Sequence, residues 1–421
     1  MFGFLKNVKF LFNINFLISK NTLSFDTQEN AMNPSSPGWI KKKLYLFEKE
    51  PLSMGIDDFY PQVRSSGFIY GISIKALSRL TSKFTLTELE LTKSNLVDCL
   101  YYIHAHNGRK PLDFVKDTME FYGVISPERE TLLTLKGKDT QNLEKIIHSR
   151  TQTNEPLLQK NFSHLITNAL LFLDIVGYDH YLKRKPHTQA YIAGLEAVIM
   201  NTIWMTLTKK GNKKYYDELL IQLFEKSLRY NKNLIRKLTR LEELSFKGFE
   251  SQWERRYIMD LASLAVWEDN KVEKQENTFL VQLSQLLELK RETCDDAILS
   301  AHAFISAHRA DISYLNYSNP LKNFYKQTNR TVKVLVLRNK DRLVQEIMES
   351  GELVKLLGQS TLRDLTKEER KKVRTQLLDV CKSIPSLAIF LLPGGSLMLP
   401  ILIKFIPELL PSAFRENSVE D

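Results

Sequence analysis

Apolar residues recur along most of the chain at spacings of three and four, which is the period of an amphipathic α-helix. The stretch from Leu91 to His106 is a good example, because Leu96, Leu100 and Ile103 fall on one broad face. The best strand pattern, 332–337, runs straight into a helical pattern, and no segment recurs at a fixed period. The pattern therefore predicts an all-α protein. Further helices are expected over 156–180, 187–209, 213–230, 231–246, 252–268, 273–289 and 291–308.

The composition is that of a folded, multi-domain protein. With 421 residues, 43% of them hydrophobic, the chain can bury a large core, which excludes a disordered protein. Three widely spaced cysteines, Cys99, Cys294 and Cys381, argue against a disulfide framework and favour a reducing compartment. The net charge of +10 is a modest excess, and it does not distinguish RNA from anionic lipid as a partner.

The first 31 residues differ from the rest, because they hold six of the 23 phenylalanines and lack an amphipathic period. Three interpretations stay open: translated sequence upstream of a start at Met32, a signal or anchor peptide, or an ordinary N-terminal segment. Beyond them we expect a helical region over 32–245, a helical domain over 250–312, connecting helices over 313–360 and a distinct C-terminal region over 361–416.

Motifs of common enzymes are missing from the sequence. There is no glycine-rich phosphate loop, no His-Glu-x-x-His, no Cys-x-x-Cys and no nucleophile elbow. His104 and His106 lie two apart on a predicted helix and so point in different directions. We therefore expect a protein that is not an enzyme and has no cofactor.

The predicted helix from Thr188 to Thr208 is apolar, with one charge at Glu196. It is long enough to cross a membrane, but threonine, glutamine and asparagine recur through it. This composition favours a buried core helix over a membrane span.

Residues 252–308 form two apolar helical patterns around an acidic turn, followed by a third helix. The arrangement resembles the tellurite-resistance TerB-like helical domains, although Asn270 stands where that family has glycine. The resemblance implies a metal site at the turn, with Asp269, Glu273 and Glu276 as ligands. The alternative is structural: residues of the turn cap the following helix, and its glutamates favour the positive helix end.

The C-terminal region opens with a Thr-x-x-Glu capping box at Thr366 and Glu369, which predicts the start of a helix. One face of this helix is basic, and the other carries an apolar stripe. The stripe consists of Val373, Leu377, Val380, Cys381 and Ile384.

The segment 383–403 contains no charged residue. Its 21 residues are long enough to cross a bilayer. Proline and glycine interrupt the segment, so a kinked span or two half-helices fits better than a straight span. A segment lying in the membrane interface and a buried pair of soluble helices remain alternatives. Helix-breaking residues occur at Pro385, Pro393, Gly394, Gly395 and Pro400.

The basic residues that flank the segment are more numerous on its N-terminal side, by six to two, which predicts that this side faces the cytoplasm. The six are Lys367, Arg370, Lys371, Lys372, Arg374 and Lys382.

Residues 365–414 resemble the signature of the LETM family, membrane proteins of the mitochondrial inner membrane with bacterial relatives. The resemblance rests on the capped basic helix, the proline-bearing apolar segment and Lys404-x-x-Pro407-x-x-Leu410-Pro411-Ser412-Ala413-Phe414. The layout is similar to the LETM-related, biofilm-associated proteins of Bacteroidota. In the mitochondrial members a glutamate usually stands at the place of Ser396, and a ribosome-binding domain follows the place of Phe414.

The resemblance implies one of two functions. The first is an adaptor at the bacterial inner membrane, with its helical body in the cytoplasm and with membrane lipid, the ribosome and a second copy of the chain as partners. The alternative is monovalent-cation/proton exchange, in which Asp379 and Glu408 would handle charge on either side of the apolar segment. An adaptor needs only an anchor and a basic face, so we favour it.

Overall fold

The computed structural model describes residues 32–52, 54–78, 85–125, 139–151, 168–208, 238, 240–266, 274–308, 329, 331–384, 386–387 and 402–403. In this part of the chain all regular secondary structure is helical, which confirms the predicted all-α class. The best strand pattern, 332–337, is helical as well, within a helix over 331–338. The helices before residue 309 are α3 (Trp39–Lys49), α4 (Ile56–Ser65), η1 (Phe68–Tyr70), α5 (Glu88–His106), η2 (Pro111–Asp113), α6 (Phe114–Ile125), α8 (Asp139–Arg150), α10 (Phe172–Leu182), α11 (Thr188–Thr208), η4 (Leu241–Glu243), α13 (Gln252–Val266), α14 (Lys274–Leu286) and α15 (Arg291–His308).

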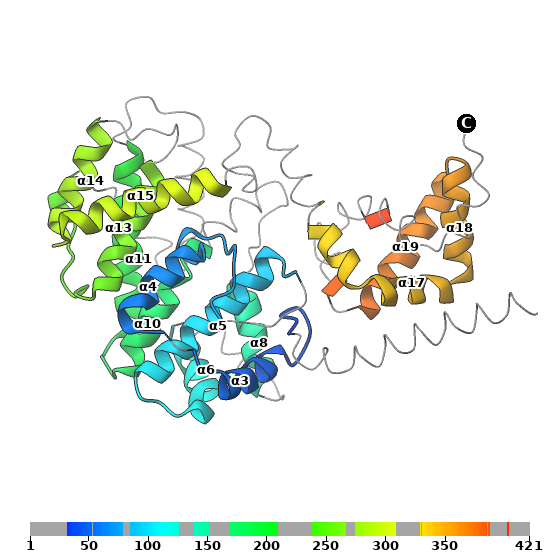
Figure 1. The fold of residues 1–421 in the computed structure, drawn as a ribbon, viewed down its shortest axis with the longest axis horizontal. Coiled ribbons are helices and arrows are strands. Elements are labelled where there is room, and N and C mark those ends of the chain that lie inside the picture. The colour runs from blue at the N-terminus through cyan, green and yellow to red at the C-terminus, as the bar shows by residue number, and fades with distance from the viewer. Residues whose placement is uncertain are drawn as a thin grey trace, which may run out of the picture.

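These helices form one body, by which we mean the described residues between 32 and 308. Helix α10 packs against α5 and α11, and α13 packs against α11 and α15 (Figure 1). Their buried side chains make a single hydrophobic cluster that reaches from Met32 to Ile305. At Gly177 of α10 a Cβ atom would lie 2.3 Å from Cδ1 of Ile192, so glycine is what lets α10 and α11 approach so closely.

Helix α5 lies in the interior of the body. It begins with a capping box at Thr87, and the predicted stripe of Leu96, Leu100 and Ile103 is fully buried. Most of its polar residues are buried too, and Asp98 forms an ion pair with Lys43 of α3 at 2.9 Å. Because burying a charge is costly unless it is paired, these contacts determine how α5 is oriented among its neighbours.

Helix α11 is the one described helix that is long and apolar enough to cross a membrane. However, 67% of its apolar window is buried inside the protein, against α10 and α13. The packing therefore supports the interpretation of this segment as a core helix.

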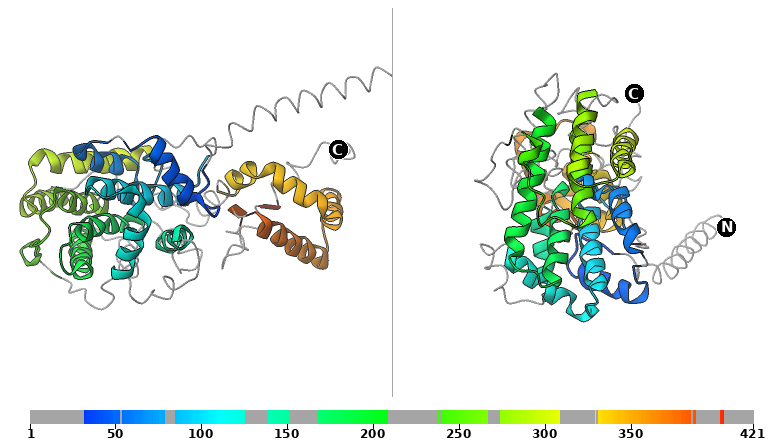
Figure 2. Two further views of the ribbon diagram at one scale, coloured as in Figure 1. Left: turned by 90° about the horizontal axis from the view of Figure 1, so that it is seen from below. Right: turned by 90° about the vertical axis from the view of Figure 1, so that its left-hand side faces the viewer.

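The C-terminal unit comprises residues 331–384, 386–387 and 402–403. It contains the helix 331–338, α17 (Lys340–Glu349), α18 (Gly351–Leu362) and α19 (Lys367–Ser383), and the last three pack on one another. Its buried residues, from Val332 to Leu402, make a second hydrophobic cluster, and the unit lies to one side of the body (Figure 2). The finer domain boundaries at 245/250 and 360/361 stay predictions.

Candidate functional site

The start of α19 is held by a reciprocal set of hydrogen bonds, which confirms the predicted capping box. The backbone amide of Glu369 donates to the Thr366 hydroxyl at 3.2 Å, and the amide of Thr366 donates to the Glu369 carboxylate at 2.8 Å. Arg363 adds two hydrogen bonds to the same carboxylate, at 2.7 and 2.9 Å. The hydrogen bonds from Arg363 and from the Thr366 amide lower the pKa of Glu369 to about 2.

The apolar stripe of α19 faces the core of the C-terminal unit. Every predicted member is buried, and Leu377 and Cys381 are 0% exposed. Burial of this stripe fixes the rotation of α19 about its axis, so the basic face is turned toward solvent. The six basic residues of the flank are all exposed.

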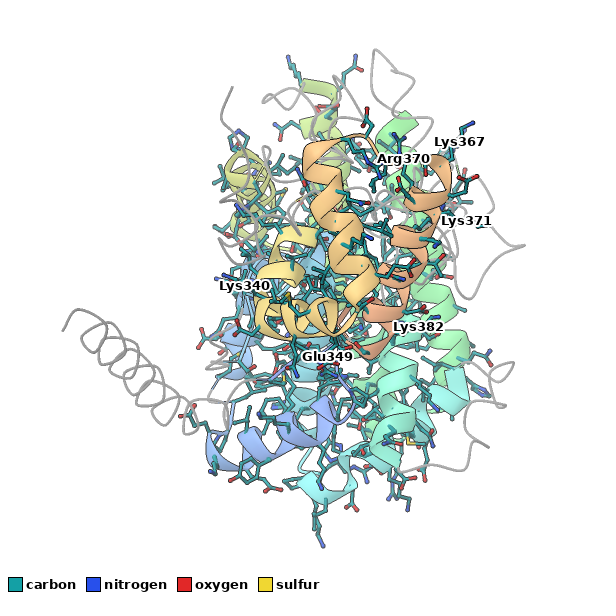
Figure 3. The ribbon with its side chains drawn as sticks, turned by 90° about the vertical axis from the view of Figure 1, so that its right-hand side faces the viewer. Lys340, Glu349, Lys367, Arg370, Lys371 and Lys382 are labelled. Carbon is teal, nitrogen blue, oxygen red and sulfur yellow. The ribbon has the colours of Figure 1, made fainter. Side chains whose placement is uncertain are left out.

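Three of the exposed cations form a stripe along α19. At 100° per residue, Lys367, Lys371 and Arg374 lie within about 60° of one another around the helix axis. The exposed acids Glu368 and Asp379 are turned about 100–120° away from Lys367. We call Lys367, Lys371 and Arg374 the basic stripe; Arg370 and Lys382 lie at its edges, and Figure 3 shows four of these five residues along the helix.

The basic stripe differs from its neighbours in its partners. Lys372 pairs with Glu352 of α18 at 2.9 Å, and Lys382 pairs with Asp379 at 2.6 Å. No residue of the basic stripe forms an ion pair with any other residue that the structure describes. No described residue therefore neutralises these charges locally, and their positive potential reaches into solvent, as an anionic partner requires.

Residues 365–421 match the family model described as "LETM1-like, RBD", where RBD denotes the ribosome-binding domain. The C-terminal region carries a LETM-family signature. No curated protein and no solved structure matches the chain. Because the match begins at Leu365, it includes α19, whereas the resemblance implied a ribosome-binding domain only after Phe414.

The LETM-like region includes the uncharged segment, of which the structure describes the two ends. Ile384, Leu387 and Leu402 are at most 1% exposed, and all three belong to the hydrophobic cluster of the C-terminal unit. Both ends of the segment are thus attached to the same helices. The predicted helix-breaking residues Pro385, Pro393, Gly394, Gly395 and Pro400 lie outside the described residues, as do Pro407 and Pro411 of the family signature.

The predicted acidic sites are only partly described. Asp379 lies on the surface of the C-terminal unit in its ion pair with Lys382, and Glu408 lies outside the described residues. At the acidic turn of the body, Asp269 and Glu273 also lie outside them, while Glu276 is buried in α14. Among the described residues no group of three His, Cys, Asp or Glu side chains is arranged to hold a metal ion.

Two contacts that shape this LETM-like site were missed by the sequence analysis. Arg363 precedes the capping box and binds Glu369, and Glu352 of α18 neutralises Lys372. No sequence pattern predicts either contact. Arg363 lies outside α19, and the packing of α18 on α19 brings Glu352 to Lys372 from 20 residues away.

Proposed function

We propose that this protein is a membrane-associated adaptor that binds ribosomes through the basic stripe of α19. The observation that carries the proposal is the position of three cations, which form no ion pair among the described residues, on one face of a helix that lies within the match to the LETM1-like ribosome-binding domain. The ribosome surface is dominated by RNA phosphates, which attract an uncompensated row of lysine and arginine at long range. The proposed role is not catalytic.

The position of α19 suits an adaptor. The helix leads at Ser383 directly into the uncharged segment that we propose to associate with the membrane. Its 17 residues span about 25 Å, so Lys367 at its start can stand well away from a membrane that holds its end. Attachment of both segment ends to one cluster supports an arrangement that enters and leaves the bilayer on the same side, rather than a single straight span.

Ribosome binding is tested by co-sedimentation of the full-length protein with bacterial ribosomes over a range of salt. The triple variant Lys367→Gln, Lys371→Gln and Arg374→Gln is expected to weaken binding at least about tenfold and to reduce the slope of log affinity against log salt by about two to three. The matched control removes the same charge elsewhere in the C-terminal unit, with Lys340→Gln, Lys355→Gln and Lys372→Gln, and should change little. Equal loss in both variants, or no loss in either, would contradict the proposal.

Membrane association and orientation have separate tests. We expect the protein to stay in the membrane fraction after carbonate washing, and release into the soluble fraction would refute the anchor. The three native cysteines are buried, so a cysteine placed at Lys371 gives a clean labelling site. With the unit in the cytoplasm, a membrane-impermeant maleimide should label this cysteine only after the membrane is opened.

A homo-oligomer stays a prediction, and no described contact favours the transport alternative.

A further inference from the structure

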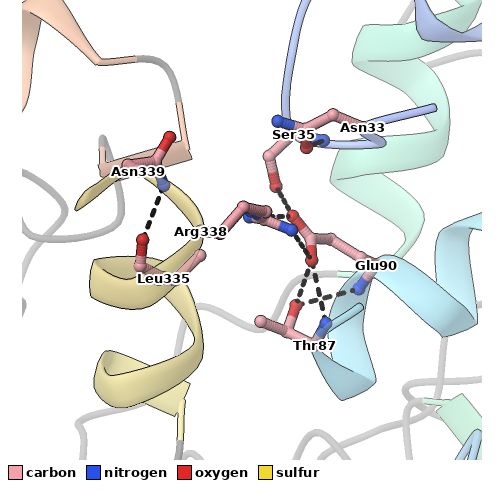
Figure 4. Close-up of polar contacts among 7 residues, drawn as sticks. All are labelled: Asn33, Ser35, Thr87, Glu90, Leu335, Arg338 and Asn339. Carbon is pink, nitrogen blue, oxygen red and sulfur yellow. Dashed lines mark hydrogen bonds and ion pairs between the residues drawn. The ribbon is translucent and has the colours of Figure 1, made fainter. Parts of the chain in front are cut away.

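The body and the C-terminal unit have separate hydrophobic cores. Within the described residues, the buried cluster of the body ends at Ile305, and that of the C-terminal unit begins at Val332. The helix 331–338 belongs to the second cluster through Val332, Leu335 and Val336. Its last residue, Arg338, instead reaches the body (Figure 4).

Arg338 makes a two-pronged ion pair with Glu90 of α5. One guanidinium nitrogen donates to Glu90 Oε2 at 2.9 Å, and the other donates to Oε1 at 2.8 Å. Both side chains are buried, with 5% of Arg338 and 1% of Glu90 exposed. Parallel hydrogen bonds of this kind fix direction as well as distance, so the pair defines how the unit sits on the body.

Contacts within the body also fix the position of the Glu90 side chain, independently of Arg338. Glu90 is the third residue of α5 and closes the capping box that Thr87 begins, and it accepts hydrogen bonds from the amide and hydroxyl of Thr87 at 2.9 and 3.0 Å. Ser35, in the turn before α3, donates a further hydrogen bond to it at 2.7 Å. Burial disfavours the charged form, but the hydrogen bonds and charge of Arg338, together with the hydrogen bonds from Ser35 and Thr87, outweigh it and lower the pKa of Glu90. The carboxylate is therefore a charged acceptor in a fixed position.

Arg338 is less completely satisfied than Glu90. Its Nε is buried and has no hydrogen-bond partner among the described residues. Burying a donor without a hydrogen-bond partner costs free energy, and this cost would be removed if the contact opened and water reached the donor. Buried ion pairs in general specify one arrangement more than they stabilise it, because their attraction is offset by lost hydration.

We propose that the Glu90–Arg338 pair is a docking latch, which holds the C-terminal unit in one orientation on the body and can open without unfolding either part. Each part keeps its own hydrophobic core when the latch opens, so the unit turns as a rigid piece. The latch controls where α19 points relative to the body. The inference does not depend on what α19 binds.

The latch is tested by the distance between two spin labels, one on the body at Lys116→Cys and one on the C-terminal unit at Asp364→Cys. Both positions are exposed, and the native cysteines are buried. The otherwise unchanged protein should give one narrow distance distribution. Arg338→Ala should widen it at least about twofold while the helical signal in circular dichroism stays constant. Arg338→Lys, which keeps the charge but loses the fork, should also widen it.

The matched control is Arg363→Ala, which removes a similar two-pronged pair with Glu369 inside the C-terminal unit. It should leave the distance distribution narrow. The latch is refuted if both Arg338 variants keep the narrow distribution, or if they lose the helical signal of α17–α19, because the pair would then be part of a single folded core. Arg338→Ala should bind ribosomes within about threefold of the unchanged protein, since one buried cation contributes little to long-range attraction. If the protein does not bind ribosomes at all, the distance measurement still decides whether the latch exists.

Discussion

The body buries several of its ion pairs, whereas the described ion pairs formed within the C-terminal unit lie on its surface. In the body, ion pairs such as Lys43–Asp98 and Arg64–Asp260 lie in the interior, among a large set of buried aromatic rings. In the C-terminal unit the described buried side chains of the hydrophobic cluster are aliphatic or cysteine, and the ion pairs formed by Lys372 and Lys382 lie on the surface.

This difference separates two uses of charge. A buried pair must find its partner in the folded state, so it selects one packing of the helices around it. An exposed pair is weak and exchanges with solvent, and an exposed cation without a partner attracts any polyanion nearby. The body thus uses charge to select one packing of its helices, whereas the C-terminal unit presents charge to solvent.

The largest effect should come from a buried pair of the body. Asp98→Ala leaves Lys43 buried without its counter-charge, and we expect it to reduce the free energy of unfolding of the body by about 3–5 kcal/mol. Urea unfolding followed by tryptophan fluorescence measures this. Arg291→Ala, which breaks an exposed pair of the body with Asp295, is the control and should leave the transition where it is. Equal shifts for the two variants would remove the distinction between buried and exposed pairs.

The next largest effect should be confined to the C-terminal unit. Leu377 is fully buried in the aliphatic cluster, so Leu377→Ala should cost about 2–5 kcal/mol through the cavity it leaves. Hydrogen exchange should become faster in α17–α19 and stay unchanged in α5 and α13. Faster exchange throughout the body would mean that the two clusters unfold as one, in conflict with the latch.

A smaller effect is expected at the start of α19. Thr366→Ala removes the acceptor of the Glu369 amide and should cost about 1 kcal/mol. Exchange of the amides in the first turn of α19 reports it directly. Thr375→Ala, which removes a hydroxyl from the exposed middle of the same helix, serves as the control. If both variants change exchange equally, the cap does not secure the helix start.

The smallest effect should depend on pH. The pKa of Glu369 is lowered to about 2 in the folded protein, from 4.5 for an unperturbed glutamate. Its contribution to stability is therefore complete above about pH 4.5 and is lost as the pH falls through about 2. The difference in stability of the C-terminal unit between the unchanged protein and Glu369→Gln should shrink over this range. A difference that is the same at pH 6 and pH 2 would contradict the role of Arg363 and the cap.

Much of the fold followed from local patterns. The apolar period predicted α5, α11, α13, α14 and α15 closely, because each buries one broad face or nearly all faces. The secondary structure of residues 332–337 was harder to predict, since a run of valine and leucine suits a strand as well as a helix. They are helical because Val332, Leu335 and Val336 all reach the same cluster at helical spacing.

By itself the sequence determined the helical class, the capped start of α19, the uncharged segment and the LETM-like signature, because each depends on residues close together along the chain. Only the tertiary structure decided which cations of α19 are paired and which form the basic stripe, since Glu352 reaches Lys372 from another helix. It also joined Glu90 to Arg338 across 248 residues. No local pattern encodes such contacts, because they arise when separately formed helices pack and their buried charges need partners.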